Sequence, residues 1–138
     1  MDARSRTTVL LIDPHKEDRE YWTQRLNVSS PDFVVLEADT GKAALAICQS
    51  HRIDCTIVEL SLPDMSGFEV LMKLVPRAFK PANAVIFLAR QGFDNLAKLA
   101  VTNGAQGYFV KSEISGNVLD QAIRKAIAVV GSNKYRQR

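Results

Sequence analysis

The sequence is poor in the residues that mark linkers and disulfide scaffolds. Its 138 residues include 7 glycines, 5 prolines and 2 cysteines. So few glycines and prolines do not fit a disordered linker. Two cysteines are too few for a disulfide framework or a tetrahedral zinc site. We therefore expect a globular protein of the reducing cytoplasm.

Long hydrophobic runs are also lacking. The longest wholly apolar run, residues 84–89, has six residues, whereas a membrane-spanning helix needs about 20. Residues 1–6 are charged and lead directly into a short apolar run, a pattern that does not fit a signal peptide. The sequence predicts no membrane association.

What is present is typical of one globular domain. Hydrophobic residues make up 46% and charged residues 24% of the chain, and this length is enough to bury a core. The net charge of +3 is uneven, because residues 124–138 hold five basic groups and no acid. We expect a domain over residues 7–130, followed by a flexible basic tail, residues 131–138.

Two kinds of segment alternate along the chain. Short, nearly continuous apolar runs predict buried strands at 8–12, 33–36, 55–58, 85–88 and 108–110. Apolar residues at helical spacing predict helices at 17–26, 42–50, 68–75, 95–102 and 117–130. Five strands alternating with five helices indicate an α/β domain with a parallel sheet.

Charged residues follow three of the predicted strands. Asp13 follows the first, Glu59 the third and Lys111 the fifth. Ligands of open α/β sheets bind at the carboxyl ends of the strands, so we expect these side chains to converge on a site there. No glycine-rich phosphate loop follows any strand, which argues against nucleotide binding.

Four segments resemble the receiver domain of bacterial two-component response regulators. They are residues 10–13 (LLID), 38–45 (ADTGKAAL), 59–67 (ELSLPDMSG) and 104–111 (GAQGYFVK). The resemblance covers nearly the whole chain in the family's order and spacing. It implies a flavodoxin-like, doubly wound, five-stranded parallel sheet of order 2-1-3-4-5 with helices on both faces.

The same resemblance implies a phosphorylation site that is degenerate here. A working receiver carries an acid pair, an acceptor aspartate, a hydroxyl residue and a lysine. In this sequence the acid pair falls on Asp13 and Pro14, and the acceptor position falls on Glu59. The hydroxyl position falls on Ala89 and the lysine on Lys111. Pro14 and Ala89 lack the expected side-chain oxygens, and glutamate places its carboxylate about one methylene farther out. A misplacement of about 1 Å can cost about 10²-fold in rate. Compared with the family pattern, these three changed positions indicate an atypical receiver, or pseudo-receiver.

Magnesium binding is expected to be weak or absent for the same reason. The family's metal site would retain Asp13, Glu59 and the backbone carbonyl of Ser61, but Pro14 removes a direct ligand. Mg²⁺ requires near-octahedral oxygen coordination. We expect no other cofactor.

Three further residues near the site are assigned from sequence. Tyr108 lies where many receivers have an aromatic switch residue, and we expect it to rest inward over the small Ala89. Arg90 is expected to be solvated. Residue 112 is serine where many receivers have proline, and a cis bond without proline costs roughly 2.5–4 kcal/mol, which leaves the Lys111–Ser112 geometry open.

We therefore expect a non-enzymatic signalling module that binds a protein: a sensor kinase, a regulator or an output protein. The resemblance places the partner surface on the segments from Phe93 to Asn103, from Tyr108 to Lys111 and from Ser115 to Val130. One alternative is a functional phosphoacceptor in a phosphorelay. Another, less favoured, is nucleic-acid binding through the basic C-terminal end.

Overall fold

The computed structural model describes residues 6–78, 81–92 and 94–136, with the side chains of all of these except 94 and 132–136. Five strands are formed: β1 (Thr7–Ile12), β2 (Phe33–Ala38), β3 (Cys55–Val58), β4 (Ala84–Ala89) and β5 (Gly107–Val110). The helices are α1 (Lys16–Ser29), α2 (Gly41–Ser50), α3 (Gly67–Leu74), α4 (Asp94–Thr102), the 3₁₀ turn η2 (Lys111–Glu113) and α5 (Gly116–Arg136). The predicted α/β alternation is confirmed.

The strands form one parallel sheet in the order β2-β1-β3-β4-β5, as the resemblance implied. Val58 of β3 lies in register with Ile12 of β1 on one side and Phe87 of β4 on the other. The strands therefore end together along one edge, and the residues that follow them share that edge. β3 and β4 are buried throughout, which explains their continuous apolar sequences.

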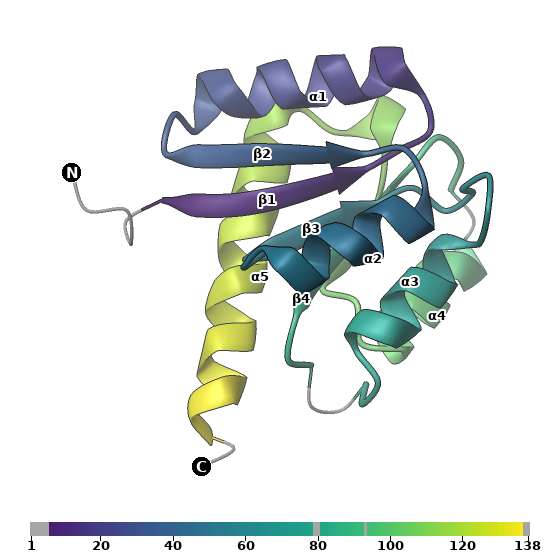
Figure 1. The fold of residues 1–138 in the computed structure, drawn as a ribbon, viewed down its shortest axis with the longest axis vertical. Helices are drawn as coiled ribbons and strands as arrows, with labels where there is room; N and C mark the ends of the chain where they lie inside the picture. Colours follow the sequence, from purple (N-terminus) through teal and green to yellow (C-terminus); the bar gives the residue numbers. More distant parts are fainter. Residues whose placement is uncertain (1–5, 79–80, 93, 137–138) are drawn as a thin grey trace.

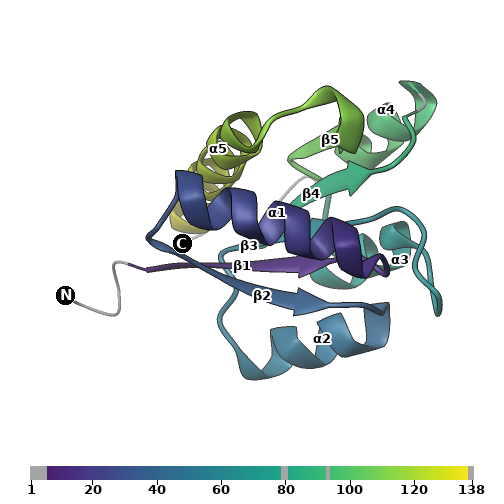
Figure 2. The same cartoon turned by 90° about the horizontal axis from the view of Figure 1, so that it is seen from above.

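Helices cover both faces of the sheet (Figures 1 and 2). On one face, α1 and α5 pack through Trp22, Leu26, Leu119 and Ile123. On the other face, α2, α3 and α4 pack through Ala44, Val70, Leu71 and Ala100. Side chains of successive strand residues point to opposite faces, so Leu11 belongs to the first core and Leu10 to the second. The result is a three-layer sandwich.

Side-chain caps fix where two helices of the second face begin. The hydroxyls of Thr40 and Ser66 accept hydrogen bonds from the amides of Ala43 and Glu69, at 3.1 and 3.2 Å. These are N-caps, which satisfy amides that have no partner inside the helix. Asp64 adds a second contact at the start of α2, because its carboxylate accepts from the amides of Gly41 and Lys42 at 2.9 Å each. The loop after β3 is thereby tied to α2.

Two glycines are required by the backbone. Gly104, after α4, has φ +101°, a region that other residues rarely adopt. A Cβ on Gly67 would lie 2.5 Å from the carbonyl oxygen of Glu59. The close approach of α3 to the end of β3 thus depends on a residue without a side chain.

The predicted end of the last helix is wrong. The sequence predicts an end at Val130, before Gly131, but α5 continues to Arg136. A glycine inside a helix costs only about 1 kcal/mol, and no proline follows to stop the helix. Residues 137–138 of the predicted tail lie outside the described residues, and the division into a domain and a flexible tail stays a prediction.

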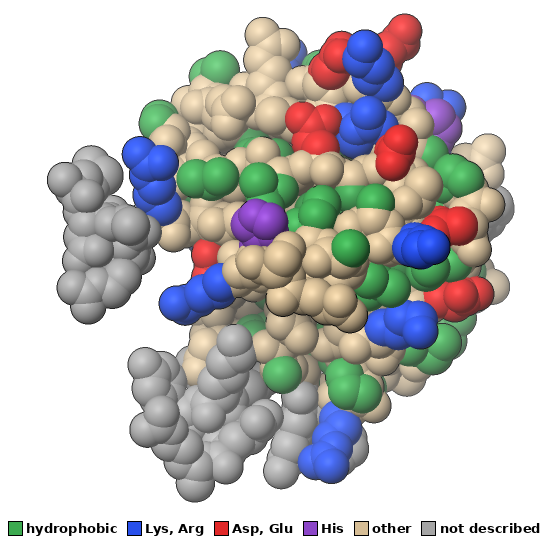
Figure 3. All heavy atoms as spheres, in the orientation of Figure 1, with side chains coloured by type: hydrophobic (Ala, Val, Ile, Leu, Met, Phe, Trp, Pro, Cys, Tyr) green, Lys and Arg blue, Asp and Glu red, His purple; other side chains and the backbone are tan. Residues whose placement is uncertain are grey.

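None of the helices in the part of the chain that the structure describes combines the length and the hydrophobicity needed to cross a bilayer. Figure 3 shows hydrophobic side chains scattered among polar and charged ones, and acidic and basic side chains close together over α1 at the top.

Candidate functional site

The three charged side chains that follow β1, β3 and β5 meet at the carboxyl edge of the sheet. The Nζ atom of Lys111 lies 2.5 Å from Oδ2 of Asp13 and 2.8 Å from Oε2 of Glu59. Side-chain exposure is only 2% for Asp13, 6% for Glu59 and 10% for Lys111. The expected convergence is therefore confirmed, and within it Glu59 pairs directly with Lys111.

A further carboxylate joins this cluster from α1. Oδ2 of Asp18 lies 2.7 Å from Nζ of Lys111 and accepts a hydrogen bond from Nε of Arg90 at 3.1 Å. Sequence reasoning missed Asp18, because an acid in the first turn of a helix is common for reasons of the helix dipole alone. Arg90 is 54% exposed, which agrees with the expected solvated arginine, and its guanidinium also pairs with Asp18.

These contacts shift the pKa of two groups in the cluster. Burial lowers the pKa of Lys111, but hydrogen bonds to Asp13, Asp18 and Glu59 raise it more, so the net pKa is above its usual value. Burial raises the pKa of Asp18, but Lys111 and Arg90 lower it more, so the net pKa is below its usual value. The cluster thus favours the charged form of both partners.

The carboxylates of Asp13 and Glu59 also accept hydrogen bonds from backbone amides. Oε1 of Glu59 accepts from the amide of Leu60 at 2.7 Å, and Oε2 from the amide of Arg90 at 3.2 Å. Oδ1 of Asp13 accepts from the amide of His15 at 2.9 Å and lies 2.9 Å from Nδ1 of the same residue. Every carboxylate oxygen of these two residues therefore has a partner within the protein.

This arrangement does not fit a resident Mg²⁺ ion. Pro14 contributes no side-chain oxygen, and Asp13 and Glu59 already bind the Lys111 ammonium. Asp13, His15 and Asp18 do bring three potential ligand atoms within 4.8 Å of one another. Lys111 is bound to both of those carboxylates, so a metal ion would have to displace a cation of the protein itself.

Ala89 and Tyr108 belong to the neighbouring strands β4 and β5. Ala89 ends β4, is 1% exposed and has no polar side-chain atom. The ring of Tyr108 stacks on Phe87, with centroids 5.7 Å apart, and its hydroxyl donates to the carbonyl of Gln91 at 2.9 Å. The ring is half-buried against the core of the second face, and the inward resting position of Tyr108 stays a prediction. Burial first, and the nearby charge of Glu59 second, raise the pKa of Tyr108.

The Lys111–Ser112 peptide bond is trans. Residues 111–113 form the 3₁₀ turn η2, which directs the chain from β5 toward α5. This geometry is the one expected where no proline offsets the cost of a cis bond.

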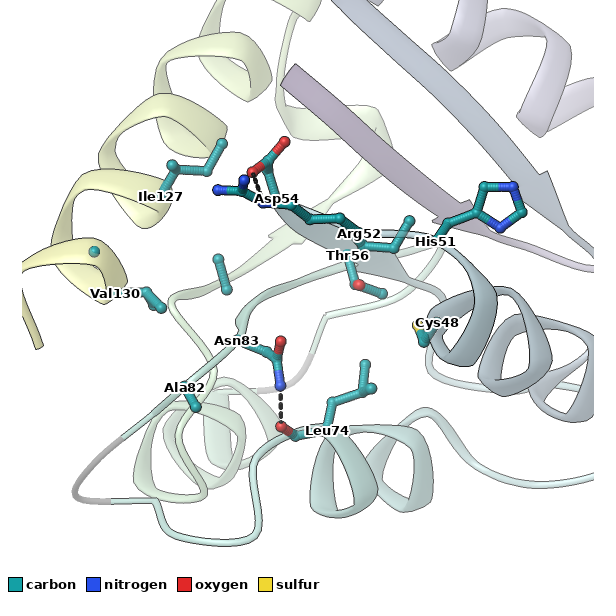
Figure 4. A pocket seen from close by; sticks show the side chains of 13 residues that line it. Cys48, His51, Arg52, Asp54, Thr56, Leu74, Ala82, Asn83, Ile127 and Val130 are labelled. Carbon is teal, nitrogen blue, oxygen red and sulfur yellow. Dashed lines mark hydrogen bonds and ion pairs between the residues drawn. The ribbon is translucent and has the colours of Figure 1, made fainter. Parts of the chain in front are cut away.

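A hollow of about 470 Å³ lies next to the charge cluster and is lined by Asp18, Tyr21, Trp22, Arg90, Lys111 and Ser112. A larger one, of about 570 Å³, lies at the opposite edge of the sheet, between the ends of α2 and α3 and the side of α5 (Figure 4). There the side-chain amide of Asn83 is turned toward the carbonyl of Leu74.

Comparison with known proteins gives a consistent result. Residues 9–124 match the family model described as the response regulator receiver domain. The transcriptional regulatory protein YdfI of Bacillus subtilis is 29% identical over 119 residues, 84% of this chain and 54% of that protein. The nitrate/nitrite response regulator protein NarL of Escherichia coli is 28% identical over 128 residues, 93% of this chain and 58% of that protein.

A solved structure supports the same assignment. The response regulator receiver domain protein from Clostridium thermocellum has a TM-score of 0.77 and 27% identity, over 88% of this chain and 94% of that one. The chain spans about half the length of the two curated relatives.

Proposed function

The chain belongs to the response regulator receiver family, and we propose that it is a receiver that signals through protein contacts without accepting a phosphoryl group. Receiver domains are signal-transduction modules that interact with sensor kinases and output domains. They are signalling modules rather than enzymes. What we propose for this member is that its site stays in one charge state, with Glu59 at the acceptor position.

The observation that supports the proposal best is the environment of Lys111. An ammonium has three N–H donors, and three carboxylates, those of Asp13, Asp18 and Glu59, lie within 2.8 Å of it. Lys111 has no donor left for a phosphoryl oxygen unless one of these contacts breaks. Phosphoryl transfer depends on groups positioned to stabilise charge on the transferred oxygens. Pro14 and Ala89 supply no polar side-chain atom for that purpose.

We propose the partner surface on α4, β5 and α5. Leu99, Val101 and Val118 on its two helices are 44–57% exposed, so this face presents apolar side chains that a protein partner would cover. Of the predicted surface, Phe93 lies outside the described residues. Partner identity, whether a sensor kinase, a regulator or an output protein, would follow from capture experiments on this face.

The test is exposure of the chain to a small phosphodonor. We expect no phosphoryl adduct by intact mass spectrometry after incubation with acetyl phosphate and Mg²⁺. The matched control is the variant Pro14→Asp/Glu59→Asp/Ala89→Thr, which restores the family's polar groups and should gain an adduct. An adduct on the wild-type chain that disappears in Glu59→Gln would establish the alternative function, a phosphoacceptor in a phosphorelay.

Nucleic-acid binding is the weaker alternative. Arg124, the first basic residue of the C-terminal group, pairs with Asp32 at 3.0 Å and with Asp120 at 2.9 Å. Its charge is thus already balanced within the fold. The side chains of Lys134, Arg136 and Arg138 lie outside the described residues. Salt-dependent binding to nonspecific DNA would be needed to favour this function.

A further inference from the structure

Asp18 connects three elements that are distant in sequence. It lies in the first turn of α1, while Arg90 begins the loop after β4 and Lys111 begins η2 after β5. One oxygen of Asp18, Oδ2, lies 3.1 Å from Nε of Arg90 and 2.7 Å from Nζ of Lys111. A single carboxylate oxygen on α1 therefore holds cations from two separate loops.

The contacts continue from Arg90 to the partner face. The backbone amide of Arg90 donates to Glu59 at 3.2 Å, so this residue is held on both its side-chain and main-chain atoms. Its neighbour Gln91 accepts the hydroxyl hydrogen bond of Tyr108 at 2.9 Å. Tyr108 belongs to β5, which pairs with β4 and packs against α4. The position of the loop after β4 and the orientation of Tyr108 are thus linked.

Asp18 also differs from the other two carboxylates of the cluster. Asp13 and Glu59 directly follow strands, and the sheet positions them. Asp18 is on a helix, and its side chain is 25% exposed, so a molecule bound at the adjacent hollow would reach it. It is the carboxylate whose contact can be made or lost without disturbing the sheet.

We propose that Asp18 is a positioning residue that fixes the loop after β4, and through it Tyr108, by bridging Arg90 and Lys111. This inference rests on the proposed function, in which no phosphoryl group is available to set that loop. The bridge of Asp18 takes over the positioning: when it is intact, Arg90 and Gln91 are held and Tyr108 stays inward. When it is broken, the loop is released.

The experiment is a comparison of ¹H–¹⁵N NMR spectra of the full chain, without any phosphodonor. We expect Asp18→Asn to change the chemical shifts of the backbone amides of Arg90, Gln91 and Tyr108. The Nε–H signal of Arg90 should also move to the chemical shift of a guanidinium that lacks this hydrogen bond. Asp18→Glu, which keeps the charge, should restore part of these shifts. The matched control is Glu17→Gln, an exposed acid of the same helical turn, whose shifts should stay within α1.

These signals report the native state, so a loss of helix stability alone would lower the melting temperature without moving the amides of the loop. Arg90→Gln breaks the same bridge from its exposed end and should move Tyr108 in the same way. If neither Asp18→Asn nor Arg90→Gln shifts the amide of Tyr108, the proposal is wrong. That result would not affect the phosphodonor test, which can still show that Glu59 accepts no phosphoryl group.

Discussion

Glu59 and Lys111 form an ion pair of 2.8 Å although a whole strand, β4, lies between the strands that carry them. The contact crosses the end of β4, where Ala89 presents only a methyl group. The extra methylene of glutamate extends its carboxylate toward the lysine. A phosphoryl group carries about −1.5 to −2 charges at neutral pH, whereas Glu59 carries one, and Asp18 adds a second negative charge beside Lys111.

Magnesium should bind this site poorly. We expect a dissociation constant above about 1 mM, because an Mg²⁺ ion would have to displace Lys111 and would find no ligand at Pro14. Isothermal titration calorimetry measures this directly. Pro14→Asp is the matched variant and should tighten binding about tenfold, which corresponds to about 1.4 kcal/mol. Saturable binding of Mg²⁺ by the wild-type chain with a dissociation constant below about 1 mM would contradict the account.

The contribution of Asp18 to stability should depend on pH in the acid range. Its pKa is lower in the folded state than its usual value, so its stabilising effect is present above about pH 4 and is lost as the pH falls through the folded pKa. We expect Asp18→Asn to lower the free energy of unfolding by about 1 kcal/mol at pH 7, since the side chain is partly exposed.

Urea denaturation of both proteins between pH 2 and pH 7 checks this dependence. The difference between wild type and Asp18→Asn should be constant above about pH 5 and should shrink below about pH 4. The contribution of Lys111 to stability has the opposite pH dependence. Its pKa is raised in the folded state, so its stabilising effect is lost only as the pH rises above about 10. A difference that grows on acidification would be inconsistent with charged Asp18 as the stabilising form.

Asp64 should matter for stability although it lies outside the charge cluster. Its carboxylate accepts from the amides of Gly41 and Lys42, and these hydrogen bonds hold its pKa below the usual value. Asp64→Ala leaves both amides at the start of α2 without this partner, so we expect a lower melting temperature by circular dichroism. Asp39→Ala, which removes an exposed acid just before the same helix, should have less effect.

The order of elements and the strand ends were predictable because the signals are local. Buried strands of a parallel sheet are continuous apolar runs, and strand ends share one edge by topology. Asp13, Glu59 and Lys111 were found in this way. Asp18 and Asp64 were not, because their partners are distant in sequence and a surface carboxylate on a helix or loop has no distinguishing pattern. The end of α5 was missed because glycine weakens a helix without stopping it.

The coupling between Glu59 and Lys111 is the central claim, and a double-mutant cycle measures it most directly. Urea denaturation at pH 7 should show that Lys111→Met lowers the free energy of unfolding by about 3 kcal/mol, the lower end of the range for breaking a buried pair. The loss should be about 1–2 kcal/mol smaller in the Glu59→Gln background. Asp13 and Asp18 still surround the lysine there, so part of the loss remains. A coupling energy of zero would mean that Glu59 and Lys111 are two independent charges. The proposal that the Glu59–Lys111 pair holds the site in one charge state would then be wrong.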